Sequence, residues 1–416
     1  MSRFSLSVRK ELESVTETLH QPLVGFEGFI VLAFLLLGFS FLLLAWSSWM
    51  NTGTLINLFW VRLLFNKLGL GILIYIVSIL LTYLTFYVQL LKVKGYFSHQ
   101  FHFFFRLSIA VSLFASLIVP SFLIAKTDMS PMVCGLCMCF IASLFLKSYS
   151  FIRVCRRLCV EHVKDEKDQP LYPSVISFTN FTFFLLSPTF VYNPFVTRST
   201  TRSYPFIVKL LVQFSLACGA AYFVVLQFMQ PILDNLTDVD VAKFCYSFLQ
   251  LMIPMITVWL LGFFAIFHCG MNIFAEILML EERNFYGFWW NATTLEDFWR
   301  EWNVLVHSWL KTHVYQETRR FLKLNKVNAS FLTFFVSALF HEFIMAWSFR
   351  MIRPYFFFAM VLQSFAMKVS KKIGNRIPVL GNVLCWMNLI IGQPLITLAY
   401  FTEYYRKQTR LLTTLV

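Results

Sequence analysis

The residues best suited to chemistry in this sequence are His341 and Glu342, which stand side by side in an otherwise apolar run from Ala329 to Trp347. A run of this length can span a bilayer as a helix. Placing one ionisable side chain at the centre of a membrane helix costs roughly 2.5–3.5 kcal/mol, so such residues usually line a cavity or a reaction path. The pair therefore indicates a functional position within the membrane.

Three interpretations of His341 fit the sequence. It could be a core histidine bonded to a neighbouring hydroxyl or carbonyl, a metal ligand, or a general base that takes a proton from a hydroxyl group. A metal site needs further ligands, and the candidates His268 and Cys269 lack ligand spacing. On a helix, Glu342 points about 100° away from its neighbour. Glu342 therefore need not touch His341, and its structural interpretation is pairing with a neighbouring helix.

A second block of unusual composition lies upstream, in Phe285-Tyr-Gly-Phe-Trp-Trp-Asn291, and is followed by Trp302-Asn303 and His307. The amide of Asn303 could donate a hydrogen bond to a developing oxyanion. The tryptophans could instead form an aromatic belt at the membrane interface. The sequence contains no Gly-x-Ser-x-Gly elbow, phosphate-binding glycine loop or His-Glu-x-x-His helix, so it gives no support to a serine hydrolase or a metalloprotease.

Composition identifies the environment that must hold these residues. Hydrophobic residues make up 58% of the 416 residues and charged residues only 13%, whereas soluble domains average about 25% charged residues. The chain is therefore expected to be an integral membrane protein that contacts the lipid bilayer. The net charge of +14 is spread over loops, which is typical of cytoplasmic loops near anionic headgroups. We expect no nucleic-acid partner, and we interpret the nine cysteines as structural thiols.

Hydropathy predicts an all-α, polytopic membrane helix bundle of about nine transmembrane helices. The apolar runs of spanning length lie near 28–47, 68–91, 103–125, 130–147, 206–228, 247–268, 329–349, 355–373 and 383–402. Two further segments are ambiguous. Residues 174–195 are interrupted by prolines, which favours a re-entrant or interfacial piece. Residues 295–323 mix aromatic and charged residues at helical spacing, which favours an amphipathic helix at the interface.

Loop charges predict an orientation. Residues 153–167 and 311–326 are basic, whereas residues 229–246 are acidic. The positive-inside rule therefore places the two basic loops in the cytoplasm and the acidic loop in the lumen. With nine crossings, the N-terminus is expected inside and the C-terminus outside.

The ordered motifs of the second half resemble those of the membrane-bound O-acyltransferase superfamily, and within it the sterol and diacylglycerol O-acyltransferases. The resemblance rests on the block 285–291, on Trp302-Asn303 through His307-Ser-Trp309, and on Ser337-Ala-Leu-Phe-His-Glu342. Supporting fragments are Lys147-Ser-Tyr-Ser-Phe151 and Ser187-Pro-Thr-Phe-Val-Tyr192. It covers about residues 145–405. Residues 28–405 are thus expected to form a single membrane-bound O-acyltransferase domain, between a short cytoplasmic N-terminal segment (1–27) and a C-terminal tail (406–416).

The resemblance implies transfer of a fatty acyl group from coenzyme A to a lipid hydroxyl, within a catalytic tunnel enclosed by the helices in the bilayer. It implies a multi-pass protein of the endoplasmic reticulum membrane that works as a homo-oligomer, a dimer or tetramer, without a cofactor or metal. His341 matches the catalytic histidine and Asn303 the assisting asparagine. The positions that match the acyl-CoA site are Arg300, Trp302, His307, Tyr315, Lys326 and Ser337.

Two departures from the family pattern stand out: Phe288 replaces an acidic residue, and Val196-Thr197-Arg198 replaces a Tyr/Phe-Pro-Arg motif. The acceptor is less defined than the reaction. Segments 321–335 and 353–358 look most like fungal-type sterol acyltransferases, whereas Gly392-Gln-Pro394 looks like the diacylglycerol enzymes. We therefore expect a sterol acceptor first and diacylglycerol second, with a lipid transporter or scaffold as the non-enzyme alternative.

Overall fold

The structure is a computed structural model that describes residues 67–93, 102–160, 173–234 and 240–414, together with the single residues Leu42, Trp46, Trp49, Met50 and Gly53. Residues 1–65 and 66–416 form two compact units. In the first unit, Trp46 and Trp49 make an edge-to-face ring contact at 5.4 Å. The second unit carries the helices described below.

Helices dominate the second unit, because most of its sequence is apolar and a helix satisfies its own backbone groups in lipid. The described residues contain seven helices that are long and apolar enough to cross a membrane. They are Leu68–Lys92, Phe103–Ala125, Pro131–Val160, Tyr204–Leu233, Val241–Ile277, Lys326–Phe349 and Pro378–Lys407. The predicted polytopic helical membrane protein is thereby confirmed.

Two of the nine predicted spans are not among these seven helices. Residues 355–373 do form a helix, α16 (Tyr355–Gly374), but it is not among the seven spanning candidates. Its C-terminal half carries Lys368, Lys371 and Lys372, which would have to leave the hydrocarbon. The span predicted near 28–47 lies almost entirely outside the described residues.

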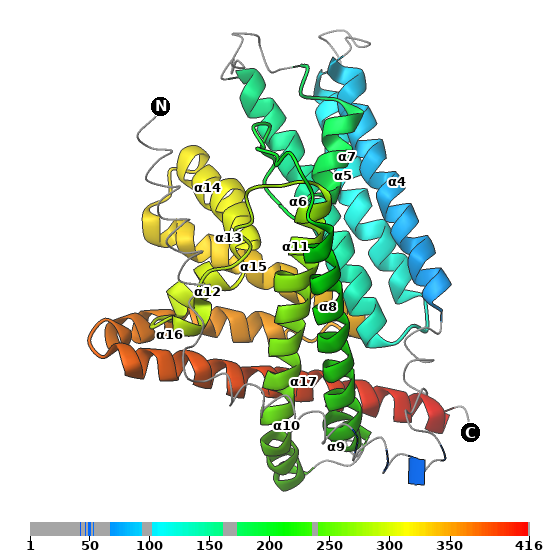
Figure 1. Cartoon of the computed structure of the whole chain (residues 1–416), viewed down its shortest axis with the longest axis vertical. Helices are drawn as coiled ribbons and strands as arrows, with labels where there is room; N and C mark the ends of the chain where they lie inside the picture. Colours follow the sequence, from blue (N-terminus) through cyan, green and yellow to red (C-terminus); the bar gives the residue numbers. More distant parts are fainter. Residues whose placement is uncertain are drawn as a thin grey trace. The chain divides into compact units, whose positions relative to one another are not determined.

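Three groups of packed helices build this unit (Figure 1). The first comprises α4 (Leu68–Val93), α5 (His102–Ala125) and α6 (Pro131–Val160). In the second, α8 (Tyr204–Val224) lies beside α10 (Val241–Phe263). The third comprises α15 (Lys326–Phe349), α16 and α17 (Pro378–Thr414), which follow one another as two antiparallel pairs. α17 thus includes most of residues 406–416, the segment predicted as a tail.

Helices of the second group continue through wide π turns. α8 leads into η2 (Val225–Met229) and α9 (Gln230–Asp234). α10 leads into η3 (Phe264–Gly270) and α11 (Met271–Ile277). Such turns are rare and occur frequently at functional sites.

Short helices fill the space between these groups. α7 (Phe178–Leu186) is too short to cross a bilayer, which agrees with the interfacial or re-entrant piece predicted for 174–195. The expected single amphipathic helix at 295–323 is instead broken at Asn303. Its parts are α12 (Leu295–Trp302), α13 (Val304–Leu310), η5 (Lys311–Tyr315) and α14 (Gln316–Phe321), preceded by η4 (Trp289–Asn291).

Lys147 of α6 fastens the end of α7. Its buried ammonium donates hydrogen bonds to the carbonyl oxygens of Phe184, Leu185 and Ser187, at 3.1, 2.7 and 2.5 Å. A lysine has three donors, and the end of a helix leaves carbonyls without partners. The three donors of Lys147 are therefore all used by these three carbonyls. The two motif fragments 147–151 and 187–192 are therefore neighbours in space.

We predict that Lys147→Met destabilises the folded protein. Each carbonyl left without a partner costs about 1–3 kcal/mol, so the midpoint of thermal unfolding in detergent should fall clearly. Lys126→Met, at an exposed lysine directly after the end of the preceding helix α5, is the control and should leave the midpoint unchanged. Equal midpoints for the two variants would contradict the role assigned to Lys147.

Candidate functional site

His341 lies in the middle of α15, and its ring has two defined neighbours. Nδ1 lies 2.8 Å from the carbonyl oxygen of Ser337, one turn earlier. A carbonyl can only accept, so Nδ1 carries the proton in this hydrogen bond. One face of the ring stacks on Phe356 of α16, with centroids 5.1 Å apart and planes 11° from parallel. In the neutral imidazole, Nε2 consequently keeps its lone pair and can act as a base.

Glu342 does not serve as a partner of His341. Its carboxylate accepts hydrogen bonds from the Tyr400 hydroxyl, at 2.9 Å to each oxygen, and from the backbone N–H of Phe357 at 3.1 Å. These groups belong to α17 and α16 respectively. The prediction that Glu342 pairs with a neighbouring helix is confirmed.

Asn303 forms the break between α12 and α13. Its backbone is extended, with φ −141° and ψ 85°, and its side-chain oxygen accepts from the N–H of Val306 at 3.1 Å as the N-cap of α13. Because asparagine caps accept through oxygen, the amide nitrogen remains a donor for another group. The geometry thus leaves Asn303 able to donate a hydrogen bond.

The aromatic block at 285–291 lies against the end of α12. Gly287 N–H donates to the carbonyl of Glu301 at 2.8 Å, and Val304 N–H donates to that of Phe285 at 3.1 Å. A Cβ on Gly287 would lie only 3.0 Å from Cγ of Glu301, so this approach favours glycine. The two motifs that carry the resemblance are therefore joined by backbone hydrogen bonds, on either side of Asn303.

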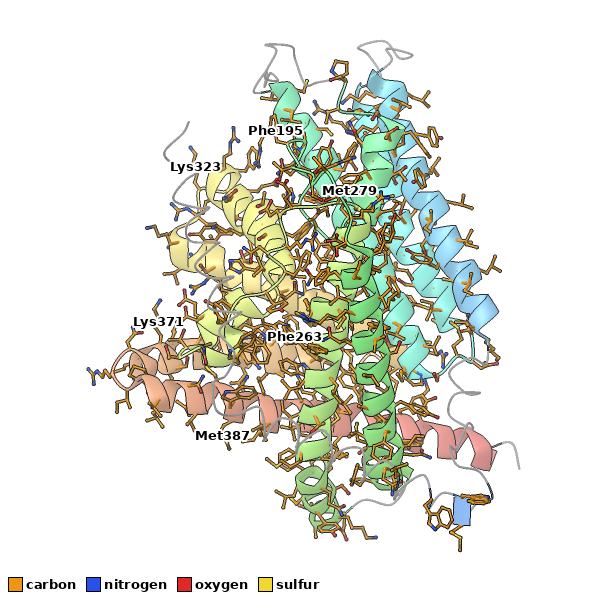
Figure 2. All side chains as sticks on the ribbon, in the orientation of Figure 1. Phe195, Phe263, Met279, Lys323, Lys371 and Met387 are labelled. Carbon is orange, nitrogen blue, oxygen red and sulfur yellow. The ribbon has the colours of Figure 1, made fainter. Side chains whose placement is uncertain are left out.

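The tryptophans form a buried aromatic cluster. Trp302 stacks on Trp259 of α10, with centroids 4.1 Å apart, and lies 4.8 Å from the ring of Phe263 (labelled in Figure 2). Trp289, only 3% exposed, meets both Trp259 and Phe263 edge on. An interfacial belt exposes its rings to headgroups, so packing, rather than belt formation, explains Trp289.

Aromatic contacts place the broken helix against the helix that bears His341. Trp299 of α12 meets Phe334 of α15 at 6.1 Å, and Trp309 of α13 meets Phe340 at 6.5 Å. Asn303 thus lies in the segment between two contacts with α15. The His341 ring bonds to Ser337 of α15, and the Asn303 side chain bonds to Val306 of α13. These hydrogen bonds therefore do not join the two residues to each other.

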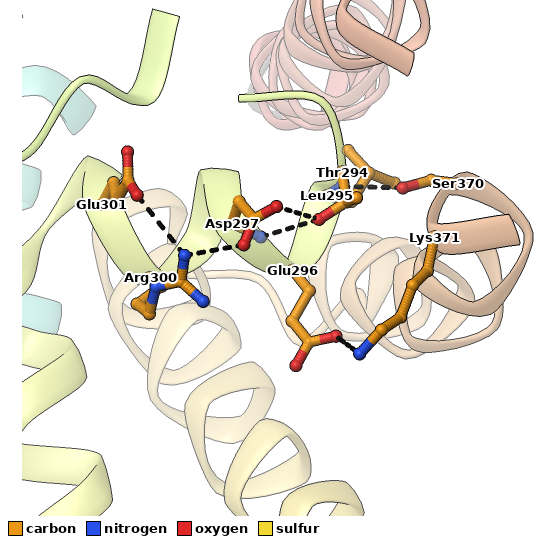
Figure 3. Close-up of polar contacts among 8 residues, drawn as sticks. All are labelled: Thr294, Leu295, Glu296, Asp297, Arg300, Glu301, Ser370 and Lys371. Carbon is orange, nitrogen blue, oxygen red and sulfur yellow. Dashed lines mark hydrogen bonds and ion pairs between the residues drawn. The ribbon is translucent and has the colours of Figure 1, made fainter. Parts of the chain in front are cut away.

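Arg300, a predicted coenzyme A contact, is already paired. Its guanidinium lies 2.7 Å from Asp297 and 3.4 Å from Glu301 (Figure 3). The first turn of α12 is in turn held on α16, because Leu295 N–H donates to the Ser370 hydroxyl at 2.7 Å and Lys371 pairs with Glu296 at 2.7 Å. Arg300 is thus part of an ion-pair group on the α12 surface.

The other predicted acyl-CoA residues are distributed along the broken helix and α15. His307 is half-buried in α13, where burial, Lys311 and Arg300 together lower its pKa. Tyr315 ends η5, and Lys326 is exposed as the first residue of α15. Ser337 contributes its backbone carbonyl to His341.

One buried network joins α6 to η5 and was missed by sequence reasoning. His313 Nε2 lies 2.8 Å from the hydroxyl of Ser150, which also accepts from the N–H of Tyr192 at 2.9 Å. The two carboxylate oxygens of Glu317, in α14, accept hydrogen bonds from Nε and Nη2 of Arg153, at 3.0 and 2.7 Å. Ser150 lies inside a flagged motif, but no pattern marked His313 among the charged residues of 295–323.

The metal interpretation of His341 finds no support in the described part of the chain, which contains no group of three or more metal-ligating side chains. His268, the other histidine considered as a ligand, is bonded through Nδ1 to the hydroxyl of Tyr286 at 2.7 Å. Among the cysteines of α6, Cys134 is buried and Cys139 is exposed, and neither forms a disulfide.

The arrangement is that of a membrane-embedded helical protein with an intramembrane histidine and a separate asparagine amide. The model of the membrane-bound O-acyltransferase family matches residues 29–402, and the chain belongs to this family. It is 33% identical over 246 residues to diacylglycerol O-acyltransferase 1 of Dictyostelium discoideum, covering 58% of this chain and 40% of that protein.

Two further relatives carry related names. Diacylglycerol O-acyltransferase 1A of Glycine max is 30% identical over 71% of this chain and 62% of its own length. The chain is also 31% identical to diacylglycerol O-acyltransferase 1 of Bos taurus, over 56% of this chain and 48% of that protein. The chain spans roughly half the length of these curated relatives. The closer likeness to sterol enzymes expected from the sequence is not supported by these names.

The two departures from the family pattern are both at the surface. Phe288 is 48% exposed and contacts the ring of Trp290 at 5.6 Å. In the second departure, Val196 is 38% exposed and Thr197 is exposed, next to the matching Arg198, whose guanidinium lies 3.9 Å from the ring centre of Phe183. None of these departing side chains belongs to the aromatic cluster around Trp302.

We predict that Phe288→Asp is tolerated. The side chain is half exposed and lies outside the seven candidate membrane spans, so an added carboxylate is not buried in the protein and should leave the thermal unfolding midpoint unchanged. Trp289→Asp at the neighbouring buried position is the matched control and should prevent folding, because it places an unpaired charge in the cluster. A large loss of stability in Phe288→Asp would show that Phe288 packs against another surface.

Proposed function

We propose that this protein transfers a fatty acyl group from acyl-CoA to the free hydroxyl of diacylglycerol, giving triacylglycerol and free coenzyme A. The observation that carries the proposal is the His341 ring, bonded at Nδ1 to the Ser337 carbonyl and thus left with a basic Nε2 inside a membrane helix. Family membership supports acyl transfer. The names of the relatives support diacylglycerol, and the sterol acceptor becomes the second candidate.

The proposed reaction is a direct displacement. Nε2 of His341 takes the proton from the acceptor hydroxyl as its oxygen attacks the thioester carbonyl carbon. The tetrahedral intermediate collapses with cleavage of the carbon–sulfur bond. The coenzyme A thiolate receives the proton from the imidazolium, which restores the neutral ring. The proposal contains no acyl-enzyme, since the contacts that the structure gives to His341 are the backbone carbonyl of Ser337 and the ring of Phe356, and neither is a nucleophilic hydroxyl or thiol.

Asn303 is suited to stabilise the tetrahedral intermediate. Its oxygen is used by the N-cap of α13, so the group directed to substrate would be the NH2 donor, which matches an oxyanion or a departing sulfur. Removal of a comparable donor in other enzymes costs about 3–4 kcal/mol.

Lys326 is the predicted cation best placed for coenzyme A. It is exposed at the N-terminus of α15, where the helix dipole adds to the attraction for phosphate. Arg300, by contrast, already has two carboxylate partners. Location in the endoplasmic reticulum membrane and assembly into a dimer or tetramer remain predictions from the family.

We predict that His341→Ala abolishes ester formation while the protein remains folded. Asn303→Ala should lower kcat by about a hundredfold or more, in line with loss of an oxyanion donor. The measurement is incorporation of labelled acyl groups from acyl-CoA by the purified protein, with diacylglycerol and a sterol offered together. Leu339→Ala, at an exposed position on the same helix, is the control.

Each outcome separates the candidate functions. Labelled triacylglycerol identifies the proposed enzyme, and labelled steryl ester alone would return the sterol acceptor to first place. No ester with well-folded protein would favour a transporter or scaffold. Near-normal turnover in folded His341→Ala protein would end the proposed mechanism.

We predict that Lys326→Gln raises KM for acyl-CoA by about two- to fivefold without lowering kcat, because an exposed charge contact contributes up to about 1 kcal/mol. Added salt should reproduce the effect in the unmodified protein through screening. Lys323→Gln, three residues earlier and also exposed, controls for the loss of one positive charge. A KM equal to that of this control would exclude a direct contact.

A further inference from the structure

We propose that Glu342 and Tyr400 are positioning residues for His341, and that they act through the ring of Phe356. The inference rests on the proposed function, in which His341 is the general base. It starts from the first turn of α16, where three helices meet through side-chain bonds to the backbone. We call this group, made of Glu342, Tyr400 and the backbone of residues 353–357, the α16 clamp.

The α16 clamp is built around one buried hydroxyl. Tyr400 has no exposed surface, and its hydroxyl lies 2.9 Å from both carboxylate oxygens of Glu342 and 2.8 Å from the carbonyl of Arg353. The same hydroxyl accepts from the N–H of Phe356 at 3.4 Å, while Glu342 accepts from the N–H of Phe357. Two N–H groups at the start of α16, which the helix itself cannot satisfy, are thereby bound by α15 and α17.

Phe356 connects the clamp to His341. Its backbone N–H is held by Tyr400, and its ring lies face to face with the imidazole, 5.1 Å away. Rotation of an imidazole about its last side-chain bond has broad minima. The single hydrogen bond to Ser337 fixes where Nδ1 points, and the flat surface of Phe356 fixes the plane of the ring. Together they determine the direction of the Nε2 lone pair.

The geometry favours positioning over a proton relay. Successive residues of a helix point about 100° apart, and both carboxylate oxygens of Glu342 are occupied by Tyr400 and Phe357. A carboxylate at a helix N-terminus is also favoured by the helix dipole. Glu342 therefore orders α16, and its effect reaches His341 through Phe356.

The first experiment measures kcat and KM for Tyr400→Phe, Phe356→Leu and the double variant, with saturating acceptor. Each single variant should lower kcat about ten- to a hundredfold with KM for acyl-CoA nearly unchanged, as expected for a displaced reacting group. The double variant should be little worse than either single one, because both act on the same ring. Tyr404→Phe, one turn later on α17, removes a hydroxyl outside the clamp and should behave as the unmodified protein.

The second experiment compares Glu342→Gln with Glu342→Ala. The amide oxygen of glutamine can still accept from Tyr400 or Phe357, so Gln should keep most of the kcat that Ala loses. Equal losses in the two variants would show that the negative charge itself is required, and would overturn the positioning role.

The two proposals fail in distinguishable ways. Unchanged kcat in folded Tyr400→Phe protein, alongside an inactive His341→Ala variant, would overturn the clamp and leave the general base intact. Independent, multiplying losses in the double variant would also overturn the path through Phe356. Activity retained by His341→Ala would instead remove the proposed function on which the inference rests.

Discussion

Helix ends at membrane depth release backbone groups that lipid cannot satisfy, and this constraint governs the described part of the molecule. Two helix ends in the described part of the chain are bound by side chains of neighbouring helices. Lys147 supplies three donors to the carbonyls at the end of α7. The α16 clamp supplies acceptors to the N–H groups at the start of α16. Polar side chains that are costly to place in an apolar sequence are therefore needed to bind the backbone groups released where its helices end.

The same constraint explains why the candidate site lies where it does. A continuous helix buries its backbone and offers only side chains, whereas the break at Asn303 gives the chain a polar corner beside α15. Aromatic packing around Trp302 and Trp289 then supports this corner from the side of α10. Residues 289–303 therefore supply both the polar group of the site, Asn303, and two of the aromatic rings that pack beside it, Trp289 and Trp302.

Hydropathy alone predicted most of the helical architecture, because spanning length and apolar composition are local properties. It overcounted at α16, where Lys368, Lys371 and Lys372 follow an apolar half. The pairing of Glu342 with a neighbouring helix, away from His341, also followed from a local rule. The partner Tyr400, 58 residues away in sequence, could not, since only tertiary packing brings it near.

The break at Asn303 escaped prediction for a related reason. Helical spacing of aromatic and charged residues continues across 295–323, so the periodicity gives no sign of an extended residue within it. The His313–Ser150 contact likewise depends on how η5 meets α6. The sequence pattern predicts each helix separately, whereas the candidate site depends on contacts between helices.

The two uses of Asn303, as the observed cap of α13 and as the proposed amide donor to substrate, limit which side chains suit this position. Serine, threonine or aspartate would preserve the cap of α13 but would remove the amide donor. Glutamine would keep the amide on a longer side chain that is a poor cap. Among the natural side chains, asparagine alone combines a short acceptor for Val306 with an amide NH2 group. In the proposed mechanism, the folding of α13 and the chemistry of acyl transfer therefore constrain the same side chain.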